Sequence, residues 1–284
     1  MAFIKNVVSI FTGSEPEFPS TIPFTEEDPC AGCADPCEAH PQLPGYLQKK
    51  IEGGPLVGSM KPYKRHIMVT EGTSRTWVER LEEADTLTKV VGELVESKGD
   101  SVKYRSIVTA CDPMLLEDSA GDAADGSEIL LFPELVLMTG VNGTNALSLV
   151  STLLEKGTIP QSITTTPLKG KAWIFVCTHK KRDKRCGVAG PMLVDEFRKA
   201  AKELGMTEEV TVYGCSHFGG HKFAGNIIIY HRNPVISGNW YGRVKTCHVR
   251  PILQTTVEEG RVFKELWRGA MQRDDDLAKP RRDW

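Results

Sequence analysis

Two cysteines and two histidines in the C-terminal half of the sequence have the side-chain types of a four-ligand metal site. Eight residues separate Cys177 from Cys186, and three separate His217 from His221. Each pair follows a short apolar run that we expect to form a strand, so both pairs would lie at the sheet edge where α/β proteins build their sites. Two thiolates and two imidazoles suit zinc or an iron–sulfur cluster.

The spacing of these residues bears on the choice of metal. Cysteines of structural zinc sites are usually about two to four residues apart, so the gap between Cys177 and Cys186 is long for a zinc knuckle. Gly219 and Gly220 would let the histidine loop turn tightly around a bulky ligand. The residues alone therefore favour a two-iron cluster, and zinc stays open as the alternative.

The composition narrows the class of protein. The chain has 284 residues with 35 basic and 37 acidic side chains, and a net charge of −2 excludes a strongly basic nucleic-acid binder. No apolar run reaches the roughly 18–20 residues that span a bilayer, so we expect no membrane segment. The eight cysteines and the absence of a convincing secretory signal favour a reducing compartment. We expect a cytoplasmic protein, with mitochondria as the alternative.

Hydrophobic patterning in the C-terminal half predicts an α/β unit that would position the four residues. The predicted strands are Ala172–Val176, Val210–Tyr213 and Asn226–Tyr230. Helices are predicted over Pro191–Leu204, with proline in its first turn, and over Phe263–Met271, after a short element at Gly260–Val262.

The N-terminal half predicts a second α/β unit. We expect strands at His66–Thr70, Val102–Thr109 and Ile129–Met138, the last either a strand pair or one strand bent at Pro133. Helices are expected over Thr76–Ser97 and over Asn145–Lys156, the latter ended by Gly157. The proline- and threonine-rich stretch Thr158–Gly170 reads as a linker. We therefore predict two domains, residues 1–160 and 168–284.

Motifs along nearly the whole chain resemble the sucrase/ferredoxin-like family. They include the stretches CAGCADPC from Cys30, GSMKPYKRH from Gly58, Trp77, HFGGHKFAGN from His217, WYG from Trp240 and LWRG from Leu266. The resemblance implies a C-terminal thioredoxin-like ferredoxin domain. It also implies a 2Fe–2S cluster held by Cys177, Cys186, His217 and His221.

The function implied by this resemblance is one-electron transfer rather than conversion of a substrate. Histidine ligation raises the potential of a cluster relative to four cysteines, and each imidazole keeps a second nitrogen that can hold a proton. We therefore expect proton-coupled electron transfer, with a flavin-type reductase or another redox protein as partner. The rival hypotheses are a zinc-stabilised, non-catalytic binding module and a thiol–disulfide oxidoreductase using Cys30 and Cys33.

The eight residues between Cys177 and Cys186 carry strong positive charge. The basic residues are Lys180, Lys181, Arg182, Lys184 and Arg185. They read either as a docking patch for an acidic redox partner or as a solvated loop.

The remaining cysteines and histidines have less specific patterns. Cys30, Cys33 and Cys37 have the spacing of a zinc half-site or a dithiol, and a structural role is the simpler interpretation. We expect His179 and His231 to be core or solvent-facing side chains that could also support the ligands. Cys215, two residues before His217, could be a spare ligand, and a buried thiol at a strand end is the simpler interpretation. Three residues read as structural: Cys111, Cys247 and His248.

The sequence ends in Asp283 and Trp284. A terminal tryptophan after an acidic residue resembles the tripeptide by which the cytosolic iron–sulfur assembly machinery recognises its clients. The third residue from the end, Arg282, departs from the leucine common in that signal.

Overall fold

A computed structural model describes residues 18–31, 40–99, 102, 104–113 and 127–273. In this part of the chain, ten strands form one sheet in the order β12-β10-β9-β7-β8-β3-β2-β4-β5-β6. The first half of that sheet contains β2 (Arg65–Thr70), β3 (Ser106–Cys111), β4 (Ser127–Phe132), β5 (Val136–Val141) and β6 (Thr164–Pro167). The second half contains β7 (Ala172–Cys177), β8 (Val210–Cys215), β9 (Ile227–His231), β10 (Asn239–Tyr241) and β12 (Trp267–Ala270).

The two halves of the sheet fold over and face each other. They join where β3 pairs with β8, at the single register pair Cys111–Cys215. The ring of His66 in β2 nevertheless lies 2.6 Å from the hydroxyl of Tyr230 in β9. Four strand spacings separate β2 from β9 in the sheet order, which is about 19 Å in a flat sheet, so the sheet must be folded.

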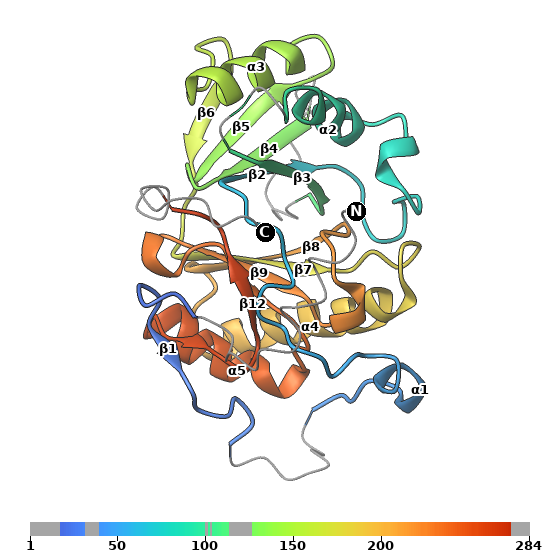
Figure 1. The fold of residues 1–284 in the computed structure, drawn as a ribbon, viewed down its shortest axis with the longest axis vertical. Coiled ribbons are helices and arrows are strands. Elements are labelled where there is room, and N and C mark those ends of the chain that lie inside the picture. The colour runs from blue at the N-terminus through green and yellow to red at the C-terminus, as the bar shows by residue number, and fades with distance from the viewer. Residues whose placement is uncertain (1–17, 32–39, 100–101, 103, 114–126, 274–284) are drawn as a thin grey trace, which may run out of the picture.

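Helices cover the outer faces of this fold (Figure 1). The first half carries α2 (Leu87–Ser97) and α3 (Ala146–Lys156), and the second half carries α4 (Lys184–Glu203) and α5 (Val249–Pro251). A π-helical segment, η7 (Ile252–Glu258), continues α5. The result is four layers: helices, half-sheet, half-sheet and helices.

Successive side chains of each strand point to opposite faces of the sheet, so apolar residues form three cores between these layers. In β7, Ile174 and Val176 pack towards α4, whereas Trp173 and Phe175 pack between the half-sheets. The first half-sheet and its helices enclose a third core. Because both faces of each half-sheet are covered, a central strand such as β7 is apolar and buried along its whole length.

The predicted α/β class is confirmed, and so is the thioredoxin-like character of the second half. Its strands β10-β9-β7-β8 include a parallel pair, β7 and β8, linked by α4, followed by the antiparallel strands β9 and β10. The region Ile129–Met138 is a strand pair, β4 and β5, joined by a turn after a cis Phe132–Pro133 bond. Helix α3 ends at Gly157 in the left-handed conformation, as predicted.

The predicted helix over Thr76–Ser97 is wrong in its first half. A short 3₁₀ turn, η2 (Leu81–Glu83), precedes α2, which begins only at Leu87. The capping groups explain this start. Thr86 accepts the backbone amide of Lys89, and the carboxylate of Glu71 accepts the amides of Leu87 and Thr88.

The predicted helix over Pro191–Leu204 begins seven residues earlier, at Lys184. Asp183 caps this helix by accepting the backbone amide of Arg185 at 2.8 Å. Pro191 therefore lies inside α4 rather than in its first turn. The aspartate determines the start of the helix more strongly than the proline does. Its carboxylate binds a backbone amide that would otherwise be unpaired in the first turn, whereas proline has no amide hydrogen and adds no such hydrogen bond.

The predicted helix over Phe263–Met271 is wrong, because this stretch forms strands. Phe263 belongs to β11 (Val262–Phe263), which pairs with β1 (Phe24–Thr25), and Trp267 begins β12, which pairs with β10. Trp267 packs into the apolar core while the adjacent Arg268 points to the other face, as strand alternation requires.

The predicted linker Thr158–Gly170 contains the exposed edge strand β6. It pairs with β5 of the first half-sheet. The predicted boundary between residues 160 and 168 stays a prediction. None of the helices in the described part of the chain combines the length and the apolar character needed to cross a membrane.

Candidate metal centre

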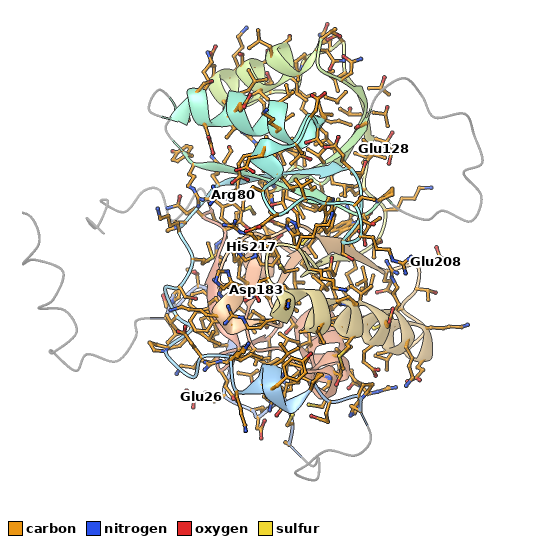
Figure 2. All side chains as sticks on the ribbon, turned by 90° about the vertical axis from the view of Figure 1, so that its right-hand side faces the viewer. Glu26, Arg80, Glu128, Asp183, Glu208 and His217 are labelled. Carbon is orange, nitrogen blue, oxygen red and sulfur yellow. The ribbon has the colours of Figure 1, made fainter. Side chains whose placement is uncertain are left out.

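The four predicted ligands lie in or directly after four neighbouring elements. Cys177 is the last residue of β7, and Cys186 lies in the first turn of α4. His217 follows the end of β8 by two residues, and His221 begins a 3₁₀ turn, η4 (His221–Phe223). Figure 2 shows His217 just above Asp183, the residue that caps the start of α4.

Three of the four ligands lie together, and the fourth lies against one of them. Donor atoms of Cys177, Cys186 and His217 are all within 4.8 Å of one another. The Cys177 Sγ atom is 3.7 Å from Nδ1 of His217, whose Nε2 is 3.4 Å from Nδ1 of His221. Both cysteines are buried, whereas both histidines are partly exposed. The site is therefore closed on the thiol side and open on the imidazole side.

Close packing of α4 brings Cys186 to Cys177. A Cβ atom on Gly190 would lie 2.3 Å from the carbonyl oxygen of Cys177, so only glycine fits at this contact. The capping carboxylate of Asp183 also binds the side chain of Arg185, which donates to the carbonyl oxygen of Lys50. These contacts fix the start of α4 below the loop that follows β7.

Arg268 holds the histidine loop from inside the protein. Its side chain donates to the carbonyl oxygen of Gly219 at 3.2 Å and to Oδ1 of Asn226 at 2.8 Å. Asn226 in turn donates to the carbonyl oxygen of Gly220. Arg268 is only 1% exposed, and burial lowers its pKa to about 10, although the Cys177 and Cys186 thiols oppose this shift. A positive charge is therefore built in beside the two thiols.

The two thiols ionise unequally. A hydrogen bond from Cys186, opposed by burial and assisted by His217, lowers the pKa of Cys177 well below its usual value. The same hydrogen bond and burial raise the pKa of Cys186. The pair therefore favours a thiolate on Cys177 beside a protonated thiol on Cys186, and a bound cation would favour the second thiolate.

His179 supports the backbone of His217. The Nδ1 atom of His179 accepts the amide of His217 at 3.2 Å, and its Nε2 donates to the carbonyl oxygen of Val78 at 2.6 Å. The ring of Trp77 packs edge-on against this buried imidazole. Burial lowers the pKa of His179, which favours the neutral ring that both hydrogen bonds require. His231 does not contact the four ligands. Its Nδ1 accepts the backbone amide of Asn233, and its Nε2 donates to the carbonyl oxygen of Val257.

The basic residues between the two cysteines do not form one loop. Lys184 and Arg185 belong to α4, and Arg185 is half-buried and ion-paired to Asp183 at 2.9 Å. The other four basic side chains are exposed: Lys180, Lys181, Arg182 and Lys184. With Lys50 and Arg75 they line a groove of about 1250 Å³ beside the start of α4.

Other predicted residues lie elsewhere or outside the described chain. Cys111 and Cys215 are opposite each other in buried strands, as structural cysteines. Cys33, Cys37, Asp283 and Trp284 lie outside the described residues, so the predicted Cys30–Cys33 dithiol and the targeting tail stay predictions. Sequence reasoning missed Arg268 as a residue of the site, and the signal that could have pointed to it was its place in the LWRG motif from Leu266.

A family model for sucrase/ferredoxin-like proteins matches residues 56–269. The chain belongs to the sucrase/ferredoxin-like family. The match contains all four predicted ligands and the residues that support them, so the resemblance seen in the sequence is confirmed.

Curated relatives match shorter segments of the chain. It is 45% identical over 100 residues to altered inheritance of mitochondria protein 32 of Debaryomyces hansenii, covering 35% of this chain and 36% of that protein. It is 39% identical over 92 residues to actin patches distal protein 1 of Saccharomyces cerevisiae, covering 30% and 29%. These segments span only about a third of the relatives' own lengths.

Solved structures include a thioredoxin-like [2Fe–2S] ferredoxin from Aquifex aeolicus. It aligns with a TM-score of 0.32 and 16% identity, covering 37% of this chain and 96% of that one.

Proposed function

We propose that this family member carries single electrons through a 2Fe–2S cluster held by two cysteines and two histidines. The observation that carries the proposal is the convergence of Cys177, Cys186 and His217 within 4.8 Å, with His221 against His217. Two thiolates and two imidazoles are a ligand set that 2Fe–2S clusters use in Rieske centres. The donor set therefore fits such a cluster.

The side chains around the site would tune its chemistry. A 2Fe–2S cluster bound here would supply reversible one-electron transfer. Neutral imidazoles from His217 and His221 make the site less negative than four thiolates would, which favours uptake of an electron. The buried guanidinium of Arg268 acts in the same direction, because its charge attracts the added electron.

The half-exposed histidines also favour coupling to protons. Each ligating imidazole keeps a second nitrogen, and both rings are partly exposed to solvent, where protons can arrive. We infer that the midpoint potential falls with rising pH by up to about 59 mV per unit. A midpoint that stays constant between pH 6 and 10 would refute this coupling but leave the electron-transfer proposal intact.

The groove beside α4 supports docking of an acidic redox protein, such as a flavin-type reductase. Its exposed lysines and arginines lie next to Cys186, the ligand in the first turn of α4. Opposite charges on a partner would steer encounter and fix its orientation near the site.

Electron paramagnetic resonance tests the proposal most directly. The full chain, purified without oxygen and reduced with dithionite, should be red-brown before reduction and give a signal with a Rieske-like average g value. Cys177→Ala and His217→Ala should abolish or change this signal. Cys215→Ala is the matched control, because it removes a buried thiol from the neighbouring strand end.

A colourless protein that contains zinc in place of iron would overturn the proposal and favour a zinc-stabilised binding module. Iron that stays bound in the Cys177 and His217 variants would also overturn it. In either case the basic groove beside α4 and the group of cysteines and histidines would need another function.

We further propose that the protein works in the cytoplasm, with mitochondria as the alternative, and obtains its cluster from the cytosolic iron–sulfur assembly machinery. Cysteine use supports a reducing compartment. Cell fractionation, with iron content measured after deletion of Trp284, tests both statements. Unchanged iron content in the deletion variant would contradict the role of the tail.

A further inference from the structure

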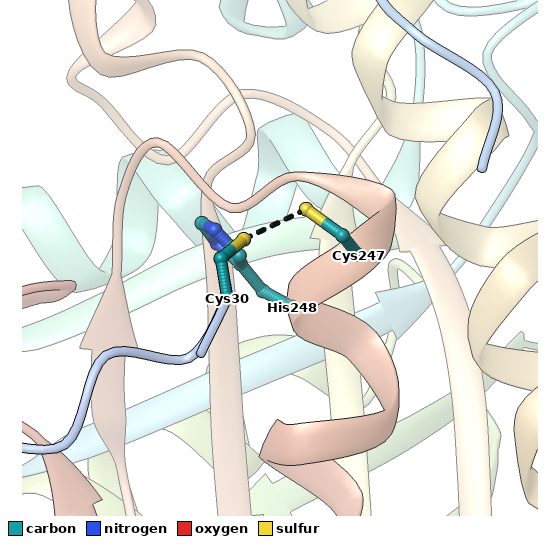
Figure 3. A group of neighbouring side chains, drawn as sticks. All are labelled: Cys30, Cys247 and His248. Carbon is teal, nitrogen blue, oxygen red and sulfur yellow. Dashed lines mark hydrogen bonds between the residues drawn. The ribbon is translucent and has the colours of Figure 1, made fainter. Parts of the chain in front are cut away.

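A second group of metal-binding side chains lies outside the candidate cluster site (Figure 3). It consists of Cys30, from the N-terminal segment, and of Cys247 and His248, from the 3₁₀ turn η6 (Thr246–His248). Donor atoms of the three residues all lie within 4.8 Å of one another, and the two sulfurs are 3.0 Å apart. Cys247 and His248 are each 5% exposed, and Cys30 is partly exposed.

Contacts on both sides of Cys30 hold the N-terminal segment against η6. Before Cys30, β1 pairs with β11, and Arg261 forms an ion pair with Glu27. After it, the hydroxyl of Thr246 donates to the carbonyl oxygen of Pro41 at 2.8 Å. The position of Cys30 is therefore set by contacts that do not involve its sulfur, as expected of a preorganised site.

The chemistry of the group favours a metal ion over a disulfide. In a tetrahedral zinc site with Zn–S bonds of about 2.3 Å, two sulfurs lie about 3.8 Å apart, so these sulfurs would separate by about 0.8 Å. A disulfide would need them to approach by about 1 Å and would leave the neighbouring buried imidazole without a role. Two thiolates and an imidazole are a donor set that zinc prefers.

The imidazole of His248 must change its hydrogen bonding to bind a metal. Its Nδ1 accepts the backbone amide of Lys245 at 3.2 Å, which places the proton of the neutral ring on Nε2. Coordination through Nε2 moves that proton to Nδ1 and breaks the contact with Lys245. One such hydrogen bond is a small loss against the binding free energy of a structural zinc ion.

We propose that Cys30, Cys247 and His248 form a zinc site that fastens the N-terminal segment to η6. Binding of Zn²⁺ replaces the two thiol protons, which pass to solvent, and three protein ligands leave one tetrahedral position for water or another donor. The site shares no ligand with the candidate cluster site, and the proposal does not depend on the proposed electron transfer.

Alkylation of the full chain by N-ethylmaleimide, followed by peptide mass spectrometry, tests the site without any substitution. Zn²⁺ should protect Cys30 and Cys247 together, and a chelator should restore their reactivity. At free zinc about one hundred times above Kd, protection should approach a hundredfold. Mg²⁺ is the control ion, because it prefers oxygen ligands and should protect neither thiol.

Metal analysis of variants provides a second, independent readout. Cys247→Ser and His248→Ala should lose one zinc per chain while iron content stays unchanged. Cys111→Ser, which alters a buried thiol outside both groups, should retain both metals. Equal zinc content in wild type and Cys247→Ser would overturn the proposal. So would an unprotected Cys30, or a Cys30–Cys247 disulfide in zinc-free protein purified without oxygen.

Discussion

The imidazole of His179 accepts a hydrogen bond from the backbone amide of His217, at 3.2 Å. The same ring donates to the carbonyl oxygen of Val78, in the loop that precedes α2. One neutral side chain thus connects the first half of the molecule to the loop that carries two of the candidate ligands.

Removing the acceptor on His179 should loosen that loop. We expect His179→Phe to retain less iron and to lose it faster to a chelator, because the amide of His217 is left unpaired, a loss of about 1–3 kcal/mol. His179→Asn is the matched control, since its amide oxygen can take the place of Nδ1. Iron retention equal in the two variants would show that the hydrogen bond does not position His217.

Arg268 should control the potential of the site through its charge. In Arg268→Met, redox potentiometry should give a midpoint shifted to more negative values, because the guanidinium interacts with both Cys177 and Cys186. Arg268→Lys keeps the charge but loses the forked contacts with Asn226 and Gly219. A midpoint that moves equally in both variants would assign the effect to hydrogen bonding instead.

Gly220 and its neighbour Gly219 offer a matched pair of substitutions. Both have positive φ, so alanine at either position costs about 1–2 kcal/mol of backbone strain. A Cβ on Gly220 would also lie 2.2 Å from Nη2 of Arg268, which four hydrogen bonds hold in place, whereas a Cβ on Gly219 meets nothing within 4 Å. We therefore expect Gly220→Ala to lower thermal stability and iron content more than Gly219→Ala. Equal losses would rule out the contact with Arg268 as the cause.

The four candidate ligands could be predicted from sequence because local patterns contain the necessary information. Cys177 ends a buried strand, and the glycines before His221 mark a tight turn, so strand ends and loop chemistry indicated where the two pairs would meet. The first residues of α4 and α2 were harder to predict. The cap at Asp183 sets the start of α4 in place of the proline, and the carboxylate of Glu71 sets the start of α2 in place of the apolar spacing.

Long-range packing explains what the sequence did not reveal. Arg268 reaches the site only because β12 pairs with β10, and Cys30 meets Cys247 across 217 residues because β1 pairs with β11. Strands of two to four residues are too short to show a sequence pattern that would predict either pairing. The folding of the sheet onto itself, which brings His66 to Tyr230, likewise depends on tertiary contacts.

The basic groove should govern association with an acidic reductase. Lys180→Glu combined with Lys181→Glu should slow stopped-flow reduction several-fold at low ionic strength, because the steering field is reversed beside the site. The difference should vanish near 1 M salt, where the screening length is about 3 Å. Lys199→Glu with Lys202→Glu makes the same charge change at the other end of α4 and should have little effect. Equal slowing by both pairs would indicate a response to net charge and not to the groove.

The buried ring of His66 should make stability depend on pH. It accepts and donates within a closed network, contacting Tyr230 at 2.6 Å and Thr109 at 2.7 Å, and burial lowers its pKa to about 3. The unfolded chain binds a proton on this residue near pH 6.5 while the folded chain does not. Stability from His66 is therefore complete above pH 6.5 and is lost as the pH falls towards 3, by up to about 1.4 kcal/mol per pH unit.

A comparison of His66→Gln with Tyr230→Phe separates this titration from the loss of hydrogen bonds. Both variants should unfold more easily than wild type at pH 7, because each disrupts the same buried network. On acidification to pH 4.5, urea unfolding should show the gap between wild type and His66→Gln narrowing, since only that variant lacks the titrating ring. The curve of Tyr230→Phe should stay parallel to wild type. A His66→Gln curve that also stays parallel would mean that another group carries the pH dependence, and His248, whose pKa burial lowers to about 4, would be the next residue to replace.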